Sequence, residues 1–327
     1  MNRPDLRLRF FRSINELVVL VALGAAVAPE SAHAQSTLVV DADGQAVATD
    51  CGAATPAFST IQAAVNAAAP GDTIFVCPGT YNEQVVVTKN NLTILGAGAG
   101  ATVLRPGVVA ATTTSLVTRI PVNVAAILLV DGATGVTVRE LTVDGSAHDS
   151  GAANLNCGFI DHFDGIFYRN GSGTVDRVHV TGIRSGTVCA FGIRGESSRT
   201  GAANLIYSGN LVDNYGTAGM VCAGLNTACE ITGNTVTGRG PVDDQTQAGV
   251  AIRFGALAAI SGNTIRDNYF IPHHLPPGTP AGGVGAIAVG IFLVYADPAS
   301  NPHLLRDNTF ANNELNVQRV STREVID

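Results

Sequence analysis

The chain has 327 residues, of which 46% are hydrophobic and 14% charged, so it can form a large core and does not match a disordered protein. The net charge of −7 argues against a nucleic-acid partner, because phosphate binding requires a basic surface. Binding of an acidic polysaccharide would need a local cluster of arginines, because Lys89 is the only lysine. The scarcity of lysine also argues against a catalytic base of lysine type.

Residues 1–34 are predicted to be an export signal. The segment is rich in arginine at its start, apolar over 17–28, and ends on Ala32-His33-Ala34, the small-x-small pattern of a signal-peptidase site. The apolar run is too short to span a membrane, and no later segment is both long and free of glycine, asparagine and charge. We therefore expect a secreted or periplasmic mature domain of residues 35–327 without a membrane span.

A short helix is predicted near the start of this domain. Ser59-Thr-Ile-Gln62 matches a capping box, and Pro70-Gly71-Asp72 would end the helix before a first strand at 73–76. The apolar residues between them fall on one helical face: Ile61, Ala64, Val65 and Ala68. A helix placed there can cover a sheet edge that would otherwise expose unpaired backbone groups.

One short phrase recurs along the rest of the chain and predicts the fold. It combines an apolar residue, a bend and a second apolar residue, and successive copies lie 24 to 45 positions apart. The copies end on these residues: Val143, Val180, Val212, Val236, Ile265 and Phe310. Each reads as strand, bend, strand, which is one coil of a solenoid with loops of variable length. The later copies carry an asparagine at the bend, and we expect these asparagines to stack in a structural ladder: Asn210, Asn234, Asn263 and Asn308.

A second phrase, glycine followed by an apolar residue, falls between copies of the first. It occurs at these positions: Gly165, Gly192, Gly219, Gly249 and Gly290. Each copy reads as a further short strand, so every coil contributes at least two sheets. Strands at a steady interval without intervening helices exclude a βαβ fold, and the scarcity of hairpin turns argues against a β-sandwich. We predict an all-β, right-handed parallel β-helix with an N-terminal capping helix.

The six cysteines of an exported protein indicate disulfides, because the compartment is oxidising. Six cysteines allow 15 connectivities. The spacing favours Cys51–Cys77 and Cys222–Cys229, which leaves Cys157–Cys189 by elimination. The absence of C-x-x-C spacing argues against a zinc or redox site.

The N-terminal part of the mature chain contains a set of short motifs: Phe58-Ser-Thr-Ile-Gln-Ala-Ala-Val65, Gly71-Asp-Thr-Ile74, Pro78-Gly-Thr-Tyr81, Glu83 and Leu92-Thr-Ile-Leu-Gly96. Together they resemble the opening of pectin-lyase-like right-handed β-helix proteins. The later coil repeats are similar too, so the resemblance covers the mature chain. It implies the fold, but the superfamily includes lyases, hydrolases, esterases, epimerases and inert adhesins.

The catalytic motifs of two groups of this superfamily are incomplete here. The chain shares Gly79-Thr-Tyr81-Asn-Glu83 with pectin methylesterase-like enzymes but lacks their later aspartate segments. It lacks the Gly-His-Gly segment of polygalacturonase-like hydrolases, so Asp243-Asp244 is interpreted as two loop carboxylates.

A partial match to pectate lyases supplies the candidate catalytic residues. Phe159-Ile-Asp161-His162 matches their Trp-Ile-Asp-His motif except at the Trp. The resemblance implies acidic residues that hold Ca²⁺, here Asp161 and Asp164, and a base that removes the proton next to the uronate carboxyl, here Arg194 or Arg169. Ca²⁺ is therefore a possible cofactor. Asp176 and Arg184 are further candidates of the same kinds.

Strand alternation predicts one lateral face that carries these groups. Residues that follow the inward apolar positions of the second phrase point outward, in two columns: Phe167, Arg194, Val221 and Ala251, then Arg169, Glu196, Ala223 and Arg253. The substrate-binding candidates are Arg253, Glu196, His162 and Phe167. Guanidinium groups match sugar carboxylates, although a row of solvated charges with an Arg–Glu ion pair is the alternative.

Two functions remain open at this point. The first is binding or cleavage of an acidic polysaccharide, with lyase chemistry as the first choice. The second is a non-catalytic surface or matrix protein, which the outward apolar residues Phe167, Val221 and Phe292 would suit. Long insertions at 144–158 and 269–283 are expected to project as loops, and His273-His274 in the second is expected to be exposed without a metal.

Overall fold

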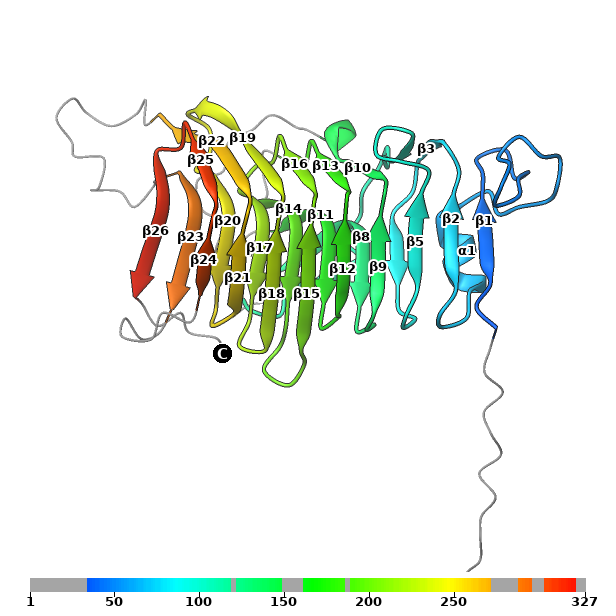
Figure 1. Cartoon of the computed structure of the whole chain (residues 1–327), viewed down its shortest axis with the longest axis horizontal. Coiled ribbons are helices and arrows are strands. Elements are labelled where there is room, and N and C mark those ends of the chain that lie inside the picture. The colour runs from blue at the N-terminus through cyan, green and yellow to red at the C-terminus, as the bar shows by residue number, and fades with distance from the viewer. Residues whose placement is uncertain are drawn as a thin grey trace, which may run out of the picture. The chain divides into compact units, whose positions relative to one another are not determined.

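Three parallel sheets run along the molecule in a computed structural model (Figure 1). The structure describes residues 34–118, 122–148, 161–185, 189–271, 288–295 and 303–321. Sheet A is made of β1 (Thr37–Val40), β2 (Thr73–Val76), β5 (Thr93–Gly96), β9 (Val136–Arg139), β12 (Gly173–Asp176), β15 (Ala203–Ser208), β18 (Thr227–Thr232), β21 (Leu257–Ser261) and β24 (Leu304–Arg306). Sheet B is made of β3 (Gly79–Tyr81), β6 (Thr102–Leu104), β10 (Thr142–Asp144), β13 (His179–Thr181), β16 (Leu211–Asp213), β19 (Thr235–Val242), β22 (Thr264–Phe270) and β25 (Thr309–Ala311).

Sheet C carries the face that the sequence singled out. It is made of β4 (Val85–Val87), β8 (Asn123–Asp131), β11 (His162–Arg169), β14 (Cys189–Glu196), β17 (Ala218–Ala223), β20 (Ala248–Arg253), β23 (Val289–Tyr295) and β26 (Leu315–Ser321). The short β7 (Thr113–Thr114) pairs antiparallel with β8, and a 3₁₀ turn (Ser146–His148) follows β10. The expected export signal lies outside the described residues, apart from Ala34.

The chain visits the sheets in the order A, B, C and then repeats. For example, β12, β13 and β14 form one coil, and β15, β16 and β17 form the next. Strands of successive coils pair in parallel and in register. The expected parallel β-helix is confirmed.

Register places like residues above one another inside the stack. On sheet A, one inward column is Val138, Val175, Tyr207, Ile231 and Ile260. All of these side chains are fully buried. Because neighbouring strands lie about 4.8 Å apart, each apolar side chain packs on its counterpart in the next coil.

The expected asparagine ladder lies at the corner between sheets A and B. The amide of Asn210 donates to Oδ1 of Asn234, that of Asn234 to Asn263, and that of Asn263 to Asn308, each over 2.9 Å. The glycines before the first three asparagines have positive φ (62°, 67° and 65°), which permits the tight bend. A second ladder, which the sequence analysis missed, links Asn268 to Asn313 over 2.9 Å in the neighbouring corner.

The repeated glycine of sheet C is required by close approach of the backbone. A Cβ atom at Gly165, Gly192, Gly219 or Gly249 would lie between 2.5 and 2.8 Å from the carbonyl oxygen of the glycine in the next coil. No side chain fits at that distance. The glycine phrase is therefore a steric consequence of stacking.

The predicted helix α1 (Ile61–Ala67) is present, but its cap differs from the expected capping box. Thr60, not Ser59, is the N-cap, and its side chain accepts from the backbone N–H of Ala63 over 3.2 Å. Gln62 instead pairs with β4 through the N–H and carbonyl of Val86, over 2.7 and 3.2 Å. Its amide thus replaces a neighbouring strand at the edge of sheet C.

Two of the three expected disulfides lie among the described residues: Cys51–Cys77 and Cys222–Cys229. Cys189 is also disulfide-bonded, and its expected partner, Cys157, lies outside the described residues. None of the helices in the described ranges has the length and hydropathy needed to cross a membrane.

Replacing Asn234 by Ala should lower the free energy of unfolding by about 3 kcal/mol, because its side chain makes four hydrogen bonds within the buried ladder. Urea denaturation would measure this. Asn204→Ala, at an exposed position on β15, is the control and should change stability by less than about 0.5 kcal/mol. Equal losses in the two variants would contradict a stabilising ladder.

Candidate functional site

The outer face of sheet C has the two columns that the sequence predicted. Phe167, Arg194, Val221 and Ala251 are in register across β11, β14, β17 and β20. Arg169, Glu196, Ala223 and Arg253 form the parallel column on the same strands. The predicted juxtaposition of arginines and a glutamate on one face therefore agrees with the strand register.

Arg194 lies at the centre of a buried cluster of polar and aromatic groups. Its Nε lies 2.8 Å from Oδ2 of Asp164, and its Nη1 lies 3.4 Å from Oε2 of Glu196. Nη1 also lies 2.8 Å from Nδ1 of His162. The guanidinium stacks on the ring of Phe167 at 4.1 Å. We call these five residues the Arg194 cluster.

The Arg194 cluster is buried. This differs from both interpretations of the sequence, a substrate-binding face and a row of solvated charges. The Arg194 side chain is 3% exposed and those of Asp164 and Glu196 are fully buried. A buried ion pair needs close geometry and further hydrogen bonds to offset the loss of hydration. The stacking on Phe167 and the bond to His162 supply part of that compensation.

A segment of residues 112–117, here called the strap, lies over this face. Its backbone pairs with the start of β8, where Thr112 donates to the carbonyl of Val124 over 2.8 Å. The Ser115 hydroxyl donates to Oε1 of Glu196 over 3.0 Å, and the Leu116 N–H donates to the same oxygen. Val117 packs with apolar residues of β17 and β20. The strap therefore anchors on Glu196 and contributes to closing the site.

Burial of the cluster shifts two pKa values. One guanidinium faces two buried carboxylates. Burial raises the pKa of the Asp164 carboxyl to about 7, although the guanidinium of Arg194 opposes the rise. Burial lowers the pKa of His162 to about 2, and the charge of Arg194 adds to that effect. His162 is therefore neutral at physiological pH, with Nδ1 free to accept from Arg194.

Arg169 and Arg253 flank the buried cluster and reach solvent. Arg169 pairs with Asp131 of β8, with 3.0 Å between Nη1 and Oδ1, and its Nε donates to the strap carbonyl of Thr114 over 2.9 Å. Its side chain remains 22% exposed. The guanidinium of Arg253 lies 4.9 Å from the ring centre of Phe254. Both arginines are thus held in place without being buried.

The acidic candidates for Ca²⁺ are not brought together. Asp161 is exposed at the start of β11, whereas Asp164 is buried against Arg194. Asp176 lies on sheet A, where its Oδ2 is 2.7 Å from Nη1 of Arg177. In the described ranges, the group of residues close enough to share a metal does not include Asp161 or Asp164. The described arrangement gives no support for Ca²⁺ at this face.

The other motifs examined in the sequence have structural roles. The Glu83 carboxylate accepts from the backbone N–H groups of Ile61 and Gln62 over 2.7 and 2.9 Å, so it caps α1. Asp244 forms a two-point ion pair with Arg239, with both distances 2.8 Å, beside a cavity of about 420 Å³ that Arg184 also lines. His273-His274 lies outside the described residues.

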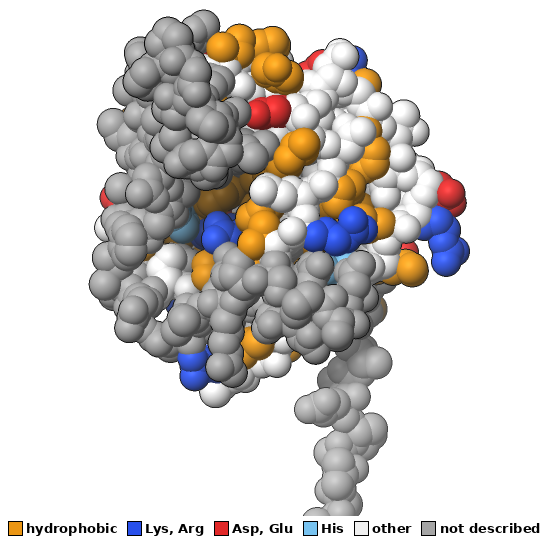
Figure 2. Space-filling view, turned by 90° about the vertical axis from the view of Figure 1, so that its left-hand side faces the viewer, with side chains coloured by type: hydrophobic (Ala, Val, Ile, Leu, Met, Phe, Trp, Pro, Cys, Tyr) orange, Lys and Arg blue, Asp and Glu red, His pale blue; other side chains and the backbone are white. Residues whose placement is uncertain are grey.

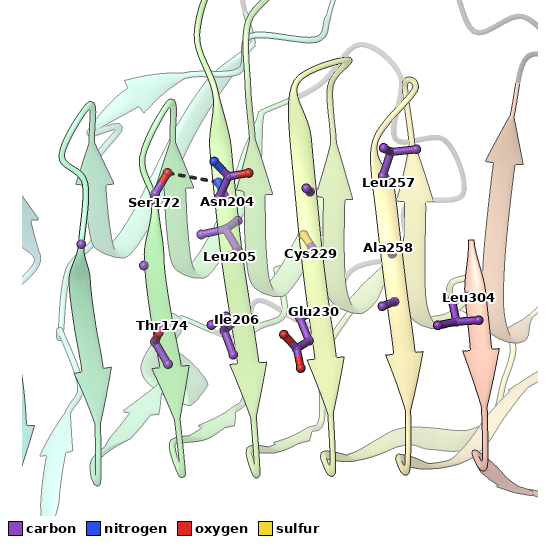
Figure 3. A pocket seen from close by; sticks show the side chains of 14 residues that line it. Ser172, Thr174, Asn204, Leu205, Ile206, Cys229, Glu230, Leu257, Ala258 and Leu304 are labelled. Atoms are coloured by element: carbon purple, nitrogen blue, oxygen red, sulfur yellow. Dashed lines mark hydrogen bonds between the residues drawn. The ribbon is translucent and has the colours of Figure 1, made fainter. Parts of the chain in front are cut away.

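Besides the second asparagine ladder, the sequence analysis missed two surface features. The strap has no repeat or motif that would reveal it. The second feature is a shallow groove of about 560 Å³ on the outer face of sheet A (Figure 3). There Ile206, Glu230 and Leu304 stand on successive or nearby strands, with exposed Leu257 beside them. Apolar residues at outward positions of β15, β21 and β24 were the available signal for it.

Lowering the pH should destabilise the fold through His162. Because the folded pKa lies below the ordinary value of 6.5, the unfolded chain binds a proton that the folded chain does not. Its contribution to stability is complete above pH 6.5 and is lost as the pH falls toward 2, by at most about 1.4 kcal/mol per pH unit. In His162→Asn, we expect a shallower loss of unfolding free energy between about pH 6.5 and 4.5, measured by urea denaturation.

Asp164→Asn should change the same profile in the opposite direction. The raised pKa means that the folded chain keeps a proton that the unfolded chain loses above 3.8, so this contribution is lost as the pH rises through about 7. Removing the carboxyl removes that decline and makes stability rise more steeply between about pH 4.5 and 6.5. Slopes that change in the same direction in both variants would contradict this assignment.

Comparisons with known proteins find solved structures that match this chain at low identity and low TM-score. No family model matches the chain, and no curated protein matches it in sequence. A pectin methylesterase from carrot is 14% identical, over 87% of this chain and 88% of that chain, with a TM-score of 0.41. An alginate lyase from Paenibacillus sp. str. FPU-7 is 14% identical, over 86% and 99%, with a TM-score of 0.32. A family 28 exopolygalacturonase from Yersinia enterocolitica is 11% identical, over 89% and 67%, with a TM-score of 0.32. Identities this low leave the activity open. What is shown is the architecture itself, a parallel β-helix of three sheets.

Proposed function

We propose that this chain is an exported β-helix protein that binds an acidic polysaccharide along the outer face of sheet C. The observation that supports this most is the placement of Arg169 and Arg253 in one registered column, both partly exposed, on an otherwise acidic chain. Guanidinium groups form two-point hydrogen bonds with carboxylates and stay charged at all physiological pH values. A row of stacked strands also suits an extended ligand.

Binding is better supported than cleavage. A base that removes a proton from a uronate must reach the substrate, and Arg194 is buried between two carboxylates under the strap. Asp164 is equally enclosed. Lyase chemistry at the Arg194 cluster would require displacement of the strap. We therefore propose binding, and keep β-elimination as a reaction to test for.

A non-catalytic protein-binding role is the second candidate, and a different face supports it. Of the outward apolar residues predicted on sheet C, Phe167 and Val221 are buried and Phe292 is partly buried, so this row offers little apolar surface to a partner. On sheet A, by contrast, Ile206 and Leu257 are exposed beside the groove. The two candidates therefore use different faces, and substitutions on each face distinguish them.

Arg253→Gln should weaken binding of the exported protein to immobilised polygalacturonate or alginate about tenfold, which is about 1.4 kcal/mol. The same change at Arg266, an exposed arginine on sheet B, is the control and should change affinity by less than about twofold. Surface plasmon resonance with a neutral glucan as reference measures both. Absence of binding to either acidic polymer, or equal losses in the two variants, would overturn the proposal.

Mass spectrometry of the same mixtures, with and without Ca²⁺, tests for cleavage. We expect the polysaccharides to remain intact. Unsaturated oligosaccharides would instead establish a lyase, saturated fragments a hydrolase, and loss of methyl or acetyl groups an esterase. Any product would move the function from binding to that reaction.

A further inference from the structure

The last coil of the stack leaves three sheet edges without a described neighbour. β24, β25 and β26 are the final strands of sheets A, B and C, and each pairs on one side only within the described ranges. Figure 2 looks at this end of the molecule and, where described residues are visible, shows hydrophobic side chains between polar ones. An unpaired edge with free backbone groups is a ready template for another strand.

The core positions of this coil are incompletely covered. Leu305, Phe310 and Val317 are in register with Ile260, Ile265 and Ile291 of the coil before, respectively. Those three isoleucines are fully buried, whereas the three residues of the last coil are only partly buried. Their inward faces would normally pack on a further coil, and repeat proteins need such a cap at each end.

Exposed leucines extend this apolar surface. Leu304 of β24 is 54% exposed and Leu315 of β26 is 40% exposed. Large apolar side chains that are exposed together, next to partly open core positions, mark an interaction surface. Within the described ranges, the end of the stack therefore combines strand edges that have no paired neighbour with exposed apolar side chains.

The opposite end of sheet C is closed, which limits the possible partners. Gln62 of α1 occupies the free edge of β4 through Val86, and Glu83 caps the first turn of that helix. The Lys89 ammonium donates to the carbonyls of Asn66 and Ala68 over 2.6 and 2.7 Å at the helix end. Because that edge is blocked, copies of this chain cannot continue sheet C by stacking head to tail. An end-to-end contact between two identical last coils stays possible, and a two-fold axis closes it.

The charges at the last coil suit contact with a second copy. Among the described residues of this coil, Arg306 and Arg319 are matched in number by Asp307 and Glu314, and Oε2 of Glu314 also accepts from the N–H of Ala288 in the coil before. A surface with one sign only would repel its own copy, whereas a two-fold axis can place a cation of one copy opposite a carboxylate of the other.

We propose that the last coil is a homodimer interface in which two copies meet end to end about a two-fold axis, with β26 of each copy pairing antiparallel with the other. β26 is the choice because it has seven residues, whereas β24 and β25 have three each. A two-fold axis perpendicular to the stack brings one sheet edge against itself in antiparallel orientation. Such a contact covers Leu315 and the partly open core positions at once.

Analytical ultracentrifugation of the exported protein tests the interface. We expect a mass of two chains at about 50 µM and dissociation on dilution. Leu315→Asp should raise the dimer dissociation constant at least about tenfold, because it places a carboxylate in the contact. The same change at Leu225, which is 56% exposed between β17 and β18, is the matched control and should leave the dimer intact.

Arg319→Glu gives a second test that does not depend on the apolar contact. It disturbs the balance of charges at the coil and should also weaken the dimer, while a circular dichroism melt checks that each variant is folded. A monomer at every concentration up to about 200 µM would overturn the proposal. So would a dimer that neither Leu315→Asp nor Arg319→Glu weakens, or one that Leu225→Asp weakens equally.

Discussion

The parallel register between coils is the constraint on which the rest of this structure depends. Each strand pairs with the strand one coil earlier, so a position in one coil stands directly on the same position in the next. A residue type that one coil requires at a position is then required at the same position in the neighbouring coils. Asparagines at the A–B corner bond to one another because their backbones are already aligned. Glycine is repeated on sheet C because a carbonyl oxygen fills the space a Cβ would need.

The same constraint explains which features could be predicted from the sequence. The spacing of repeated residues such as Asn234 and Gly192 indicates the length of each coil. Strand alternation correctly placed Arg194 and Glu196 on one outer face. The burial of that face could not be predicted in this way. It depends in part on the strap, which contacts the face through residues such as Ser115, about 80 positions from Glu196. The strap does not repeat along the chain, so its contact with the residue column on sheet C leaves no periodic signal in the sequence.

The capping helix illustrates an intermediate case. Its position followed from local sequence, because a helix nucleus and its stop signal lie within one short segment. The hydrogen bonds at its N-terminus did not follow from local sequence. Glu83, from the following coil, accepts from two backbone N–H groups, and the Gln62 side chain bonds to β4. Tertiary hydrogen bonds thus replaced the local pattern. The Glu83 motif that resembles an enzyme signature has a structural role here.

The buried Arg194 cluster has two physical explanations that lead to different conclusions about function. As an anchor, it holds the strap, and removing one member would leave a buried charge unpaired, at a cost of about 3–5 kcal/mol. As a site, it combines shifted pKa values with a covering segment, which is typical of catalytic centres. The contacts favour the anchor, because the serine and backbone donors of the strap are directed at Glu196 and not at an open space. A ligand that meets Arg169 and Arg253 from solvent then needs no movement of the strap, because both arginines are partly exposed.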